Sequence, residues 1–395
     1  MTQTNRRRLL LAAAATPWLL APARMAVAGQ GQPGGARLVL VILRGGMDGL
    51  GAVPALGDPA FADARGALGR YAADPLPLAQ GFALHPALTQ LHAAWQRNEA
   101  VVIHAAGLPY RERSHFDAQN VLESGGTRPY ELASGWLGRA LRAASGKGIA
   151  LQTAVPLVLR GHGAVDTWAP STMPDPAPDL LARLDALYAG DPALAAALGR
   201  ARALRADGAM AGMDRGGQGR GAAVALARQA VEFIARPDGA QAAVLELGGW
   251  DTHANQANPQ GPLANSLRSL DAVLGTLHEG LAAPSAQATW RRTVVVVATE
   301  FGREVAMNGT LGTDHGTGGA AFVLGGAVEG GRMVTDWPGV APRQRHEGRD
   351  LRITTDLRAV FKGVLHDHLR VPLAALDRDV LPDSAAVRPL SLLRA

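Results

Sequence analysis

The sequence predicts an α/β fold with a doubly wound, mostly parallel central sheet and helices on both faces. Four short, mostly aliphatic runs are typical of strands buried on both faces: residues 37–43, 100–104, 242–247 and 294–298, the last of which is almost entirely β-branched. Longer segments with leucines at helical spacing lie between and after them. Polar, glycine-rich turns directly follow several of these runs, which is typical of the ligand-binding edge of such a sheet.

The composition suits a large globular protein. The 395 residues are 47% hydrophobic and only 18% charged, so the chain can bury a sizeable core. The absence of cysteine excludes disulfides, thiolate catalysis and cysteine-based zinc sites. The net charge is +5, but residues 1–28 contain four arginines and no acid, so the remainder is close to neutral. Without a basic stripe, nucleic acid is not an expected partner.

Residues 1–28 predict a twin-arginine signal peptide. Three arginines at positions 6–8 precede an apolar run, and Ala-Val-Ala at 26–28 supplies a small-residue cleavage site. A transmembrane anchor is the alternative, but the run of about 15 residues is shorter than a bilayer requires, and Pro17 interrupts it. We therefore expect a periplasmic or secreted protein, exported by the twin-arginine translocase, whose mature part at 29–395 has no stable membrane span.

Two early turns offer candidate functional residues. The first predicted strand ends in a Gly-Gly turn that presents Asp48, either as a ligand or as a solvated turn aspartate. After the second strand, Ser114 begins a helical pattern that Gly125 ends. Ser114 fits an N-cap, and it also fits a nucleophile at a helix N-terminus, where free N–H groups favour a phosphate or sulfate. His115 follows directly.

The rest of the chain continues the α/β pattern. Further helices are expected at 135–144, 222–235, 263–281 and 354–368, and further strands at 155–159 and 321–324. A glycine-rich loop near 208–221 resembles a lid or a mobile surface loop more than a domain boundary. Thr355 is expected to cap the C-terminal helix, with Asp356 in its first turn.

Acidic and histidine residues gather after the later strands. Asp251 and His253 follow strand 242–247, Glu300 and Arg303 follow strand 294–298, and the next loop carries Asp314 and His315. Because the carboxyl ends of parallel strands meet at one edge of a sheet, we expect these side chains and Asp48 to converge. Carboxylates and imidazoles without thiolates suit Zn²⁺ or Mn²⁺. The pattern therefore predicts a divalent-metal site at this edge.

Seven motifs in the chain also resemble those of a known family. They are LRGGMDGL at 43–50, RSHFDAQ at 113–119, GWLGRAL at 135–141, GGWDTHANQ at 248–256, TEFGR at 299–303, GTDHGTGG at 312–319 and TTDLRAV at 354–360. Together they are similar to an exported bacterial family classed as domain of unknown function 1501. The arrangement more broadly resembles the alkaline-phosphatase superfamily, which includes phosphatases, sulfatases and cofactor-independent phosphoglycerate mutases. The resemblance covers essentially the whole mature chain.

This resemblance implies an alkaline-phosphatase-like fold and a metal-dependent hydrolase of a phosphate-type ester. The substrate would be a small-molecule or polymeric ester, and a sulfate is less expected because sulfatases generally mature their nucleophile from a cysteine. Ser114 would be the nucleophile and Asp48 the metal ligand from the first strand. Asp251, His253 and His315 would hold one metal ion, and Glu300 would help to hold a second.

The chain departs from the superfamily pattern at three points. One residue, not three, separates Asp251 from His253, and Phe301 follows Glu300 where a histidine would follow an aspartate. His115 could be the functional residue in place of Ser114. Either Arg303 or His115 compensates for the missing imidazole, or only one metal ion binds.

Two functional hypotheses therefore remain open at the level of sequence. The first is an exported ester hydrolase with one or two metal ions. The second is a non-catalytic exported binding or assembly protein that keeps the fold and at most one metal ion.

Overall fold

The computed structural model describes residues 35–161, 164–170, 176–207 and 219–394, without the side chains of 203–207. The expected signal peptide and most of the glycine-rich stretch at 208–221 lie outside the described residues. Within the described part of the chain, no helix is both long and apolar enough to cross a membrane.

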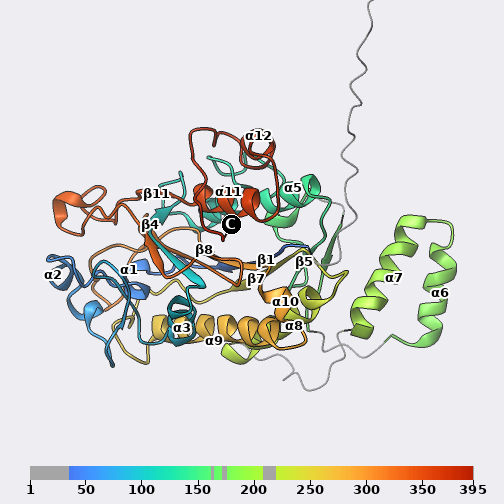
Figure 1. The fold of residues 1–395 in the computed structure, drawn as a ribbon, viewed down its shortest axis with the longest axis horizontal. Helices are drawn as coiled ribbons and strands as arrows, with labels where there is room; N and C mark the ends of the chain where they lie inside the picture. Colours follow the sequence, from blue (N-terminus) through green and yellow to red (C-terminus); the bar gives the residue numbers. More distant parts are fainter. Residues whose placement is uncertain (1–34, 162–163, 171–175, 208–218, 395) are drawn as a thin grey trace, which may run out of the picture.

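A nine-stranded sheet forms the centre of the molecule (Figure 1). Its order is β10-β4-β9-β8-β1-β7-β5-β6, and β11 pairs with β4. The strands are β1 (Arg37–Leu43), β4 (Ala100–Gly107), β5 (Gly148–Ala150), β6 (Val165–Thr167), β7 (Ala242–Leu247), β8 (Thr293–Thr299), β9 (Gly319–Leu324), β10 (Arg332–Val334) and β11 (Thr355–Asp356). A separate two-stranded sheet joins β2 (Leu76–Pro77) to β3 (Ala83–Leu84). All pairs in the large sheet are parallel except those of β9 with β4 and β8, so the predicted mostly parallel sheet is confirmed.

The central position of β1 in the sheet explains why residues 38–43 are all apolar. Leu38, Leu40 and Ile42 belong to the core on one face of the sheet, whereas Val39 and Val41 belong to the core on the other. Alternate side chains of a strand point to opposite faces, so a strand covered on both sides needs apolar residues at every position.

Helices cover both faces, as predicted (Figure 1). They are α1 (Gly49–Ala52), α2 (Phe61–Arg65), α3 (Thr89–Gln96), α4 (His115–Ser124), α5 (Trp136–Ala143), α6 (Pro178–Tyr188), α7 (Pro192–Asp207), α8 (Arg220–Ala235), α9 (Pro262–Ala282), α10 (Gln287–Trp290), α11 (Leu357–Asp367) and α12 (Leu373–Ala375). Helices α3, α8 and α9 pack on one face, and α4, α5 and α11 on the other. Short 3-10 or π turns occur at Gly66–Gly69, Leu157–Leu159, Pro342–Gln344 and Leu376–Val380.

Helices α6 and α7 form a hairpin that stands apart from the sheet (Figure 1). No residue of α6 is buried. An ion pair of 3.2 Å between Arg200 in α7 and Asp166 in β6 joins the hairpin to the edge of the sheet.

Two local predictions were wrong. The segment 155–159 is not a strand, because Pro156 has no N–H and the backbone N–H of Val158 donates to the Glu123 carboxylate instead of a neighbouring strand. The helix α11 is capped by Asp356 rather than Thr355: Asp356 accepts a bond of 2.8 Å from the N–H of Arg358, while Thr355 pairs with β4.

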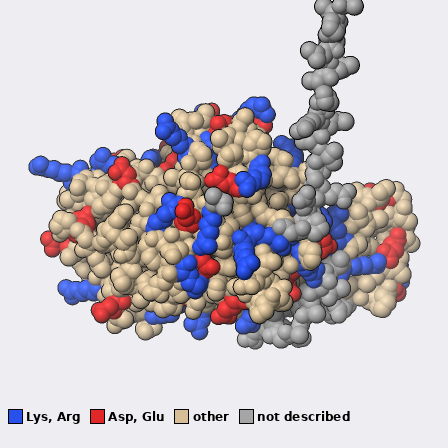
Figure 2. All heavy atoms as spheres, viewed as in Figure 1, with Lys and Arg blue, Asp and Glu red and all other residues tan. Residues whose placement is uncertain are grey.

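Charged side chains of both signs are mixed on the face shown in Figure 2. Lys and Arg alternate there with Asp and Glu rather than forming one continuous band.

Candidate metal centre

Three histidines from different segments bring their Nε2 atoms together. His115 is the first residue of α4, His253 follows β7, and His315 lies in the loop between β8 and β9. The Nε2 atom of His315 is 3.0 Å from that of His115 and 3.1 Å from that of His253. The carboxylate of Asp251 lies 2.9 Å from Nε2 of His253, 3.3 Å from that of His315 and 3.4 Å from that of His115. We call His115, Asp251, His253 and His315 the His/Asp cluster.

The other ring nitrogen of each histidine also has a partner. Nδ1 of His115 lies 2.9 Å from Glu300, and Nδ1 of His253 lies 3.0 Å from Asp314. Nδ1 of His315 lies 2.9 Å from the carbonyl oxygen of Arg113. A carboxylate or carbonyl oxygen can only accept, so each Nδ1–H donates, and this is the orientation in which Nε2 would be the ligand atom when a metal ion is bound.

The residues present fit a divalent metal ion. A tetrahedral zinc ion bound at its usual distances holds neighbouring ligand atoms about 3.3 Å apart, and the distances from Asp251 to the three rings run from 2.9 to 3.4 Å. Potential ligand atoms of His115, Asp251 and His315 all lie within 4.8 Å of one another. His253 is not part of this group of three, although its Nε2 contacts Asp251 and His315. Imidazoles with a carboxylate form a donor set that suits Zn²⁺ or Mn²⁺.

The cluster is accessible to solvent. The side chain of His115 is 20% exposed, and that of His253 is 44% exposed. These side chains are therefore partly open to solvent, in contrast to those of a closed structural zinc site.

Tight loop packing forms this arrangement. In the parallel register, Leu43 of β1 pairs with Leu247 of β7, so the turns that follow these strands lie side by side. Gly45 has a φ of +122°, and a Cβ there would lie 2.5 Å from the backbone nitrogen of Asp251. A Cβ on Gly312 would lie 2.2 Å from the backbone carbonyl group of His253. The glycines in these motifs therefore allow the loops to approach closely.

Arg303 holds Asp251 in place. Its guanidinium is buried and donates to Asp251 over 2.6 Å, to the hydroxyl of Thr313 over 3.2 Å, and to the carbonyls of Thr313 and Gly45. Burial acts to raise the pKa of Asp251, but the hydrogen bond and charge of Arg303 outweigh it and lower the pKa. Asp251 is therefore kept as a carboxylate.

Glu300 holds His115 in place, as Arg303 holds Asp251. Burial acts to raise the pKa of Glu300, but hydrogen bonds from His115 and Gln119 outweigh it and lower the pKa. The same carboxylate accepts a bond of 2.8 Å from the N–H of Gly45. Its hydrogen bond raises the pKa of His115, whereas burial and the nearby positive groups lower the pKa of His315. A metal ion competes with protons for such rings, so its affinity would depend on pH.

The structure does not bring Asp48 into this cluster. Asp48 is buried and caps α1 by accepting a bond from the N–H of Gly51. Its carboxylate is also engaged by the Arg65 guanidinium and the side-chain amide of Gln256. These contacts explain Asp48 as a structural anion that joins three segments.

The other predicted site residues lie around the cluster in different positions. Glu300 and Asp314 lie behind His115 and His253 and contact their Nδ1 atoms. Ser114 occupies the N-cap position of α4, where its side chain makes no capping bond. Its hydroxyl lies beside the phenol of Tyr110.

Sequence reasoning missed several residues that support the cluster. Asn308 donates to the carbonyl of His253 over 2.9 Å and to Asp314 over 3.1 Å, which lowers the pKa of Asp314 together with His253. Gln119 donates to Glu300 over 3.0 Å. Gln119 lies four residues after His115, so helical spacing already placed the two on one face.

Comparison with protein families gives a match, whereas comparison with curated proteins does not. A family model described as "Protein of unknown function (DUF1501)" matches residues 91–380. No curated protein matches the sequence.

Several solved structures are similar at low identity. The phosphonate monoester hydrolase of Agrobacterium radiobacter has a TM-score of 0.44 and 12% identity, with 85% of this chain and 74% of that chain covered. The PsFucS1 sulfatase from Pseudoalteromonas sp. has a TM-score of 0.41 and 12% identity, with 91% and 71% covered. The C-terminal periplasmic domain of EcEptC from Escherichia coli has a TM-score of 0.35 and 11% identity, with 75% and 74% covered. TM-scores of this size assign neither an activity nor a substrate to this chain.

Proposed function

The chain belongs to the DUF1501 protein family, and we propose that it is an exported, metal-dependent hydrolase of a phosphate-type ester. The observation that carries the proposal is the convergence of three Nε2 atoms and the Asp251 carboxylate, with a hydrogen-bond acceptor behind each ring. Supported imidazoles of this kind are typical of metal sites rather than of chance surface clusters.

One metal ion, held by the His/Asp cluster, is the simplest arrangement. Glu300 and Asp314 then orient His115 and His253 instead of binding a second ion. Arg303 positions Asp251, because its buried guanidinium is directed at protein oxygens and not at a substrate. When bound, a divalent ion would polarise a phosphoryl oxygen and neutralise charge on the transferring group.

Ser114 is the proposed nucleophile. It directly precedes His115, so its backbone lies next to the cluster, and its hydroxyl is not used to cap α4. The first N–H groups of α4 have no helical acceptor, and they would favour the negative charge of a phosphate bound beside Ser114.

Metal analysis of the purified mature protein tests the centre. We expect close to one equivalent of Zn or Mn in the wild type, and its loss in His315→Ala and Asp251→Ala. His278→Ala is a matched control, because His278 lies on α9 outside the cluster. Absence of copurifying metal, with no rise in melting temperature on adding Zn²⁺ or Mn²⁺, would rule out the centre.

Activity is tested with a panel of aryl phosphate monoesters, aryl phosphate diesters and aryl sulfates. We expect turnover of a phosphate ester that needs the metal and falls at least a hundredfold in Ser114→Ala. Unchanged turnover in Ser114→Ala would exclude the serine as nucleophile while leaving the metal centre intact.

A binding or assembly role is the second candidate, and the α6–α7 hairpin favours it. Leu180, Leu187 and Leu194 are 46%, 73% and 45% exposed on this hairpin. Exposed apolar side chains that form a contiguous patch mark interaction surfaces, and this hairpin is the candidate for such a patch. Stoichiometric metal without turnover of any ester in the panel would favour this role.

Export is also part of the proposal. Sequencing the N-terminus of periplasmic protein tests it, and we expect cleavage after Ala28. An uncleaved cytoplasmic product in a strain with an active twin-arginine pathway would contradict it.

A further inference from the structure

The ring of His315 is oriented by the backbone of a residue in a strained conformation. Nδ1 of His315 donates to the carbonyl oxygen of Arg113 over 2.9 Å. The φ angle of Arg113 is +59°, in the left-handed region that residues with a Cβ rarely adopt. Such a conformation persists only where the surrounding contacts fix it. The contacts of the Arg113 side chain therefore decide where its carbonyl group points.

Two carboxylates hold the guanidinium of Arg113. Its Nε donates to Asp350 over 2.8 Å, and its Nη2 donates to Glu347 over 2.6 Å. The Asp350 side chain is fully buried, whereas that of Glu347 is 60% exposed. Because an ion pair is stronger away from water and is screened in solvent, Asp350 is the stronger of the two anchors.

Asp350 belongs to a closed loop, residues 346–350, which we call the support loop. The N–H of His346 donates to the carbonyl of Asp350 over 2.8 Å, and the N–H of Asp350 donates back to the carbonyl of His346 over 3.0 Å. Gly348 has a φ of +68°, which lets the chain turn sharply between them. The Asp350 carboxylate is therefore held on a backbone that is itself fixed.

The support loop also holds the main chain of His315. Arg349 donates to the carbonyl of His315 over 2.8 Å, and its guanidinium pairs with Glu304 at 2.9 Å. The loop thus supports His315 twice: Arg349 contacts its backbone directly, and Asp350 supports its ring through Arg113. Arg349 lies 34 positions after His315, so local sequence gives no sign of this support.

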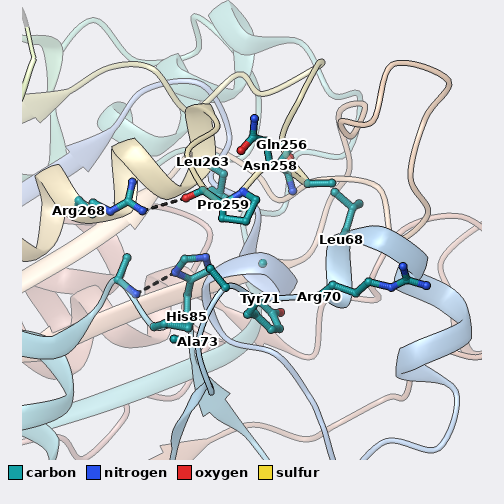
Figure 3. Close-up of a pocket in the computed structure, with 15 residues that line it drawn as sticks. Leu68, Arg70, Tyr71, Ala73, His85, Gln256, Asn258, Pro259, Leu263 and Arg268 are labelled. Atoms are coloured by element: carbon teal, nitrogen blue, oxygen red, sulfur yellow. Dashed lines mark hydrogen bonds between the residues drawn. The ribbon is translucent and has the colours of Figure 1, made fainter.

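This support is separate from the one that holds Asp251. Arg303 donates to Asp251 and to the hydroxyl of Thr313. Thr313 in turn donates over 2.8 Å to Gln256, which lines a cavity (Figure 3). Within the part of the chain that the structure describes, no residue that lines this cavity hydrogen-bonds to His315. The two supports can therefore be tested separately.

We propose that Arg113 and Asp350 are positioning residues that hold Nε2 of His315 toward the centre of the His/Asp cluster. The proposal rests on the metal centre proposed above, and both residues act through the His315 ring. Without the guanidinium of Arg113, the nearest cation to Asp350 would be Arg349, at 3.7 Å, and the carbonyl at 113 would lose its fixed direction. The ring could then turn or carry its proton on Nε2, where the proton excludes a metal ion.

The tautomer of His315 in the metal-free protein tests this orienting role. Burial lowers the pKa of His315, so its ring is neutral at pH 8, and ¹⁵N spectra of histidine-labelled protein distinguish the two ring nitrogens by which one carries the proton. The signal of His315 is the one missing from His315→Ala. We expect Nδ1–H in the wild type and a mixture of both tautomers in Arg113→Gln. Arg113→Lys should retain more Nδ1–H, because lysine can still pair with Asp350.

Competition with a chromophoric chelator measures the consequence for the metal. We expect Zn²⁺ affinity to fall about 10- to 100-fold in Arg113→Gln, the usual loss when a group behind a metal ligand is removed. Asp350→Asn should lose a similar factor, and the double variant little more than either, because the two residues act through one contact. Arg128→Gln is the matched control, since Arg128 also pairs with an acid, Glu131 at 3.3 Å, but follows α4 and is 80% exposed.

Three results would overturn the proposal: a proton on Nε2 of His315 in the wild type, the wild-type tautomer in Arg113→Gln, or unchanged Zn²⁺ affinity in that variant. A loss of stability in urea without a change in tautomer or affinity would show that Arg113 and Asp350 serve the fold alone. A wild-type protein that binds no Zn²⁺ would refute the metal centre, whereas the tautomer, measured without metal, would still decide whether Arg113 orients His315.

Discussion

Replacing Glu300 by glutamine separates the orienting role of this residue from direct metal binding. The Glu300 carboxylate is buried and accepts hydrogen bonds from Gly45, His115 and Gln119 at 2.8 to 3.0 Å. Glutamine keeps the shape and one oxygen acceptor but loses the charge. A hydrogen bond to a charged group exceeds a neutral one by roughly 1 kcal/mol, and the loss of a carboxylate behind a metal-binding histidine typically costs 10- to 100-fold in affinity.

We therefore expect Zn²⁺ affinity to fall about 10- to 100-fold in Glu300→Gln. The metal-free protein should also lose about 1–3 kcal/mol of stability, because one N–H of the new buried amide lacks an acceptor. Competition with a chromophoric chelator measures the affinity, and urea unfolding of the metal-free protein measures the stability.

Glu329→Gln is the control, since Glu329 is an exposed acid that faces Arg332 at 3.9 Å. It should change neither quantity. If Glu300→Gln bound Zn²⁺ as tightly as the wild type, the assignment of Glu300 behind His115 would be wrong. A loss as complete as that in His315→Ala would instead indicate that Glu300 is itself a ligand.

Three further changes have expected outcomes. Gly312→Ala should weaken Zn²⁺ binding at least tenfold, because the new Cβ would lie 2.2 Å from the backbone of His253; an unchanged chelator titration would contradict this. His104 is fully buried with a pKa lowered to about 4 by burial, and its Nε2 donates to the carbonyl of Val53. Its folded pKa lies below the unfolded value near 6.5, so stability is complete above pH 6.5 and falls by roughly 3 kcal/mol as the pH drops to 4; urea unfolding should show a shallower fall in His104→Gln, and equal slopes would refute it. Removal of metal with EDTA should lower the melting temperature of the wild type but not of His315→Ala, and equal shifts would show that the metal binds elsewhere.

Much of the fold could be predicted because its signal is local. The strands β1 and β7 were predicted with the bounds that the structure has, since each is a mostly apolar run that ends in a glycine-rich turn. The segment 155–159 has the same local pattern, yet a distant acid, Glu123, takes the N–H of Val158 that a strand would need. Pro156 was the local sign against a strand, whereas the contact with Glu123 is too distant in sequence to leave one.

The candidate site was predictable in its location but not in its roles. Asp251, His253 and His315 all come after predicted strands, so α/β topology predicts that they lie at the same edge of the sheet. Whether an acid faces the centre or lies behind a histidine depends on side-chain directions, and these placed Glu300 behind His115. Asp48, which has the same setting in sequence, contacts Arg65 at the end of α2 instead.

The antiparallel direction of β9 has a consequence for how this site can change over evolution. Because β8 and β9 pair antiparallel, residues 300–318 leave and re-enter the sheet at the same edge. Adjacent strands lie only about 4.8 Å apart, and doubling the length of a loop costs only about 0.6 kcal/mol of closure entropy. This loop can therefore gain or lose residues without reordering the strands. Homologous chains that share the sheet can therefore differ in the length of this segment, provided that the cluster residues near its two ends keep their places.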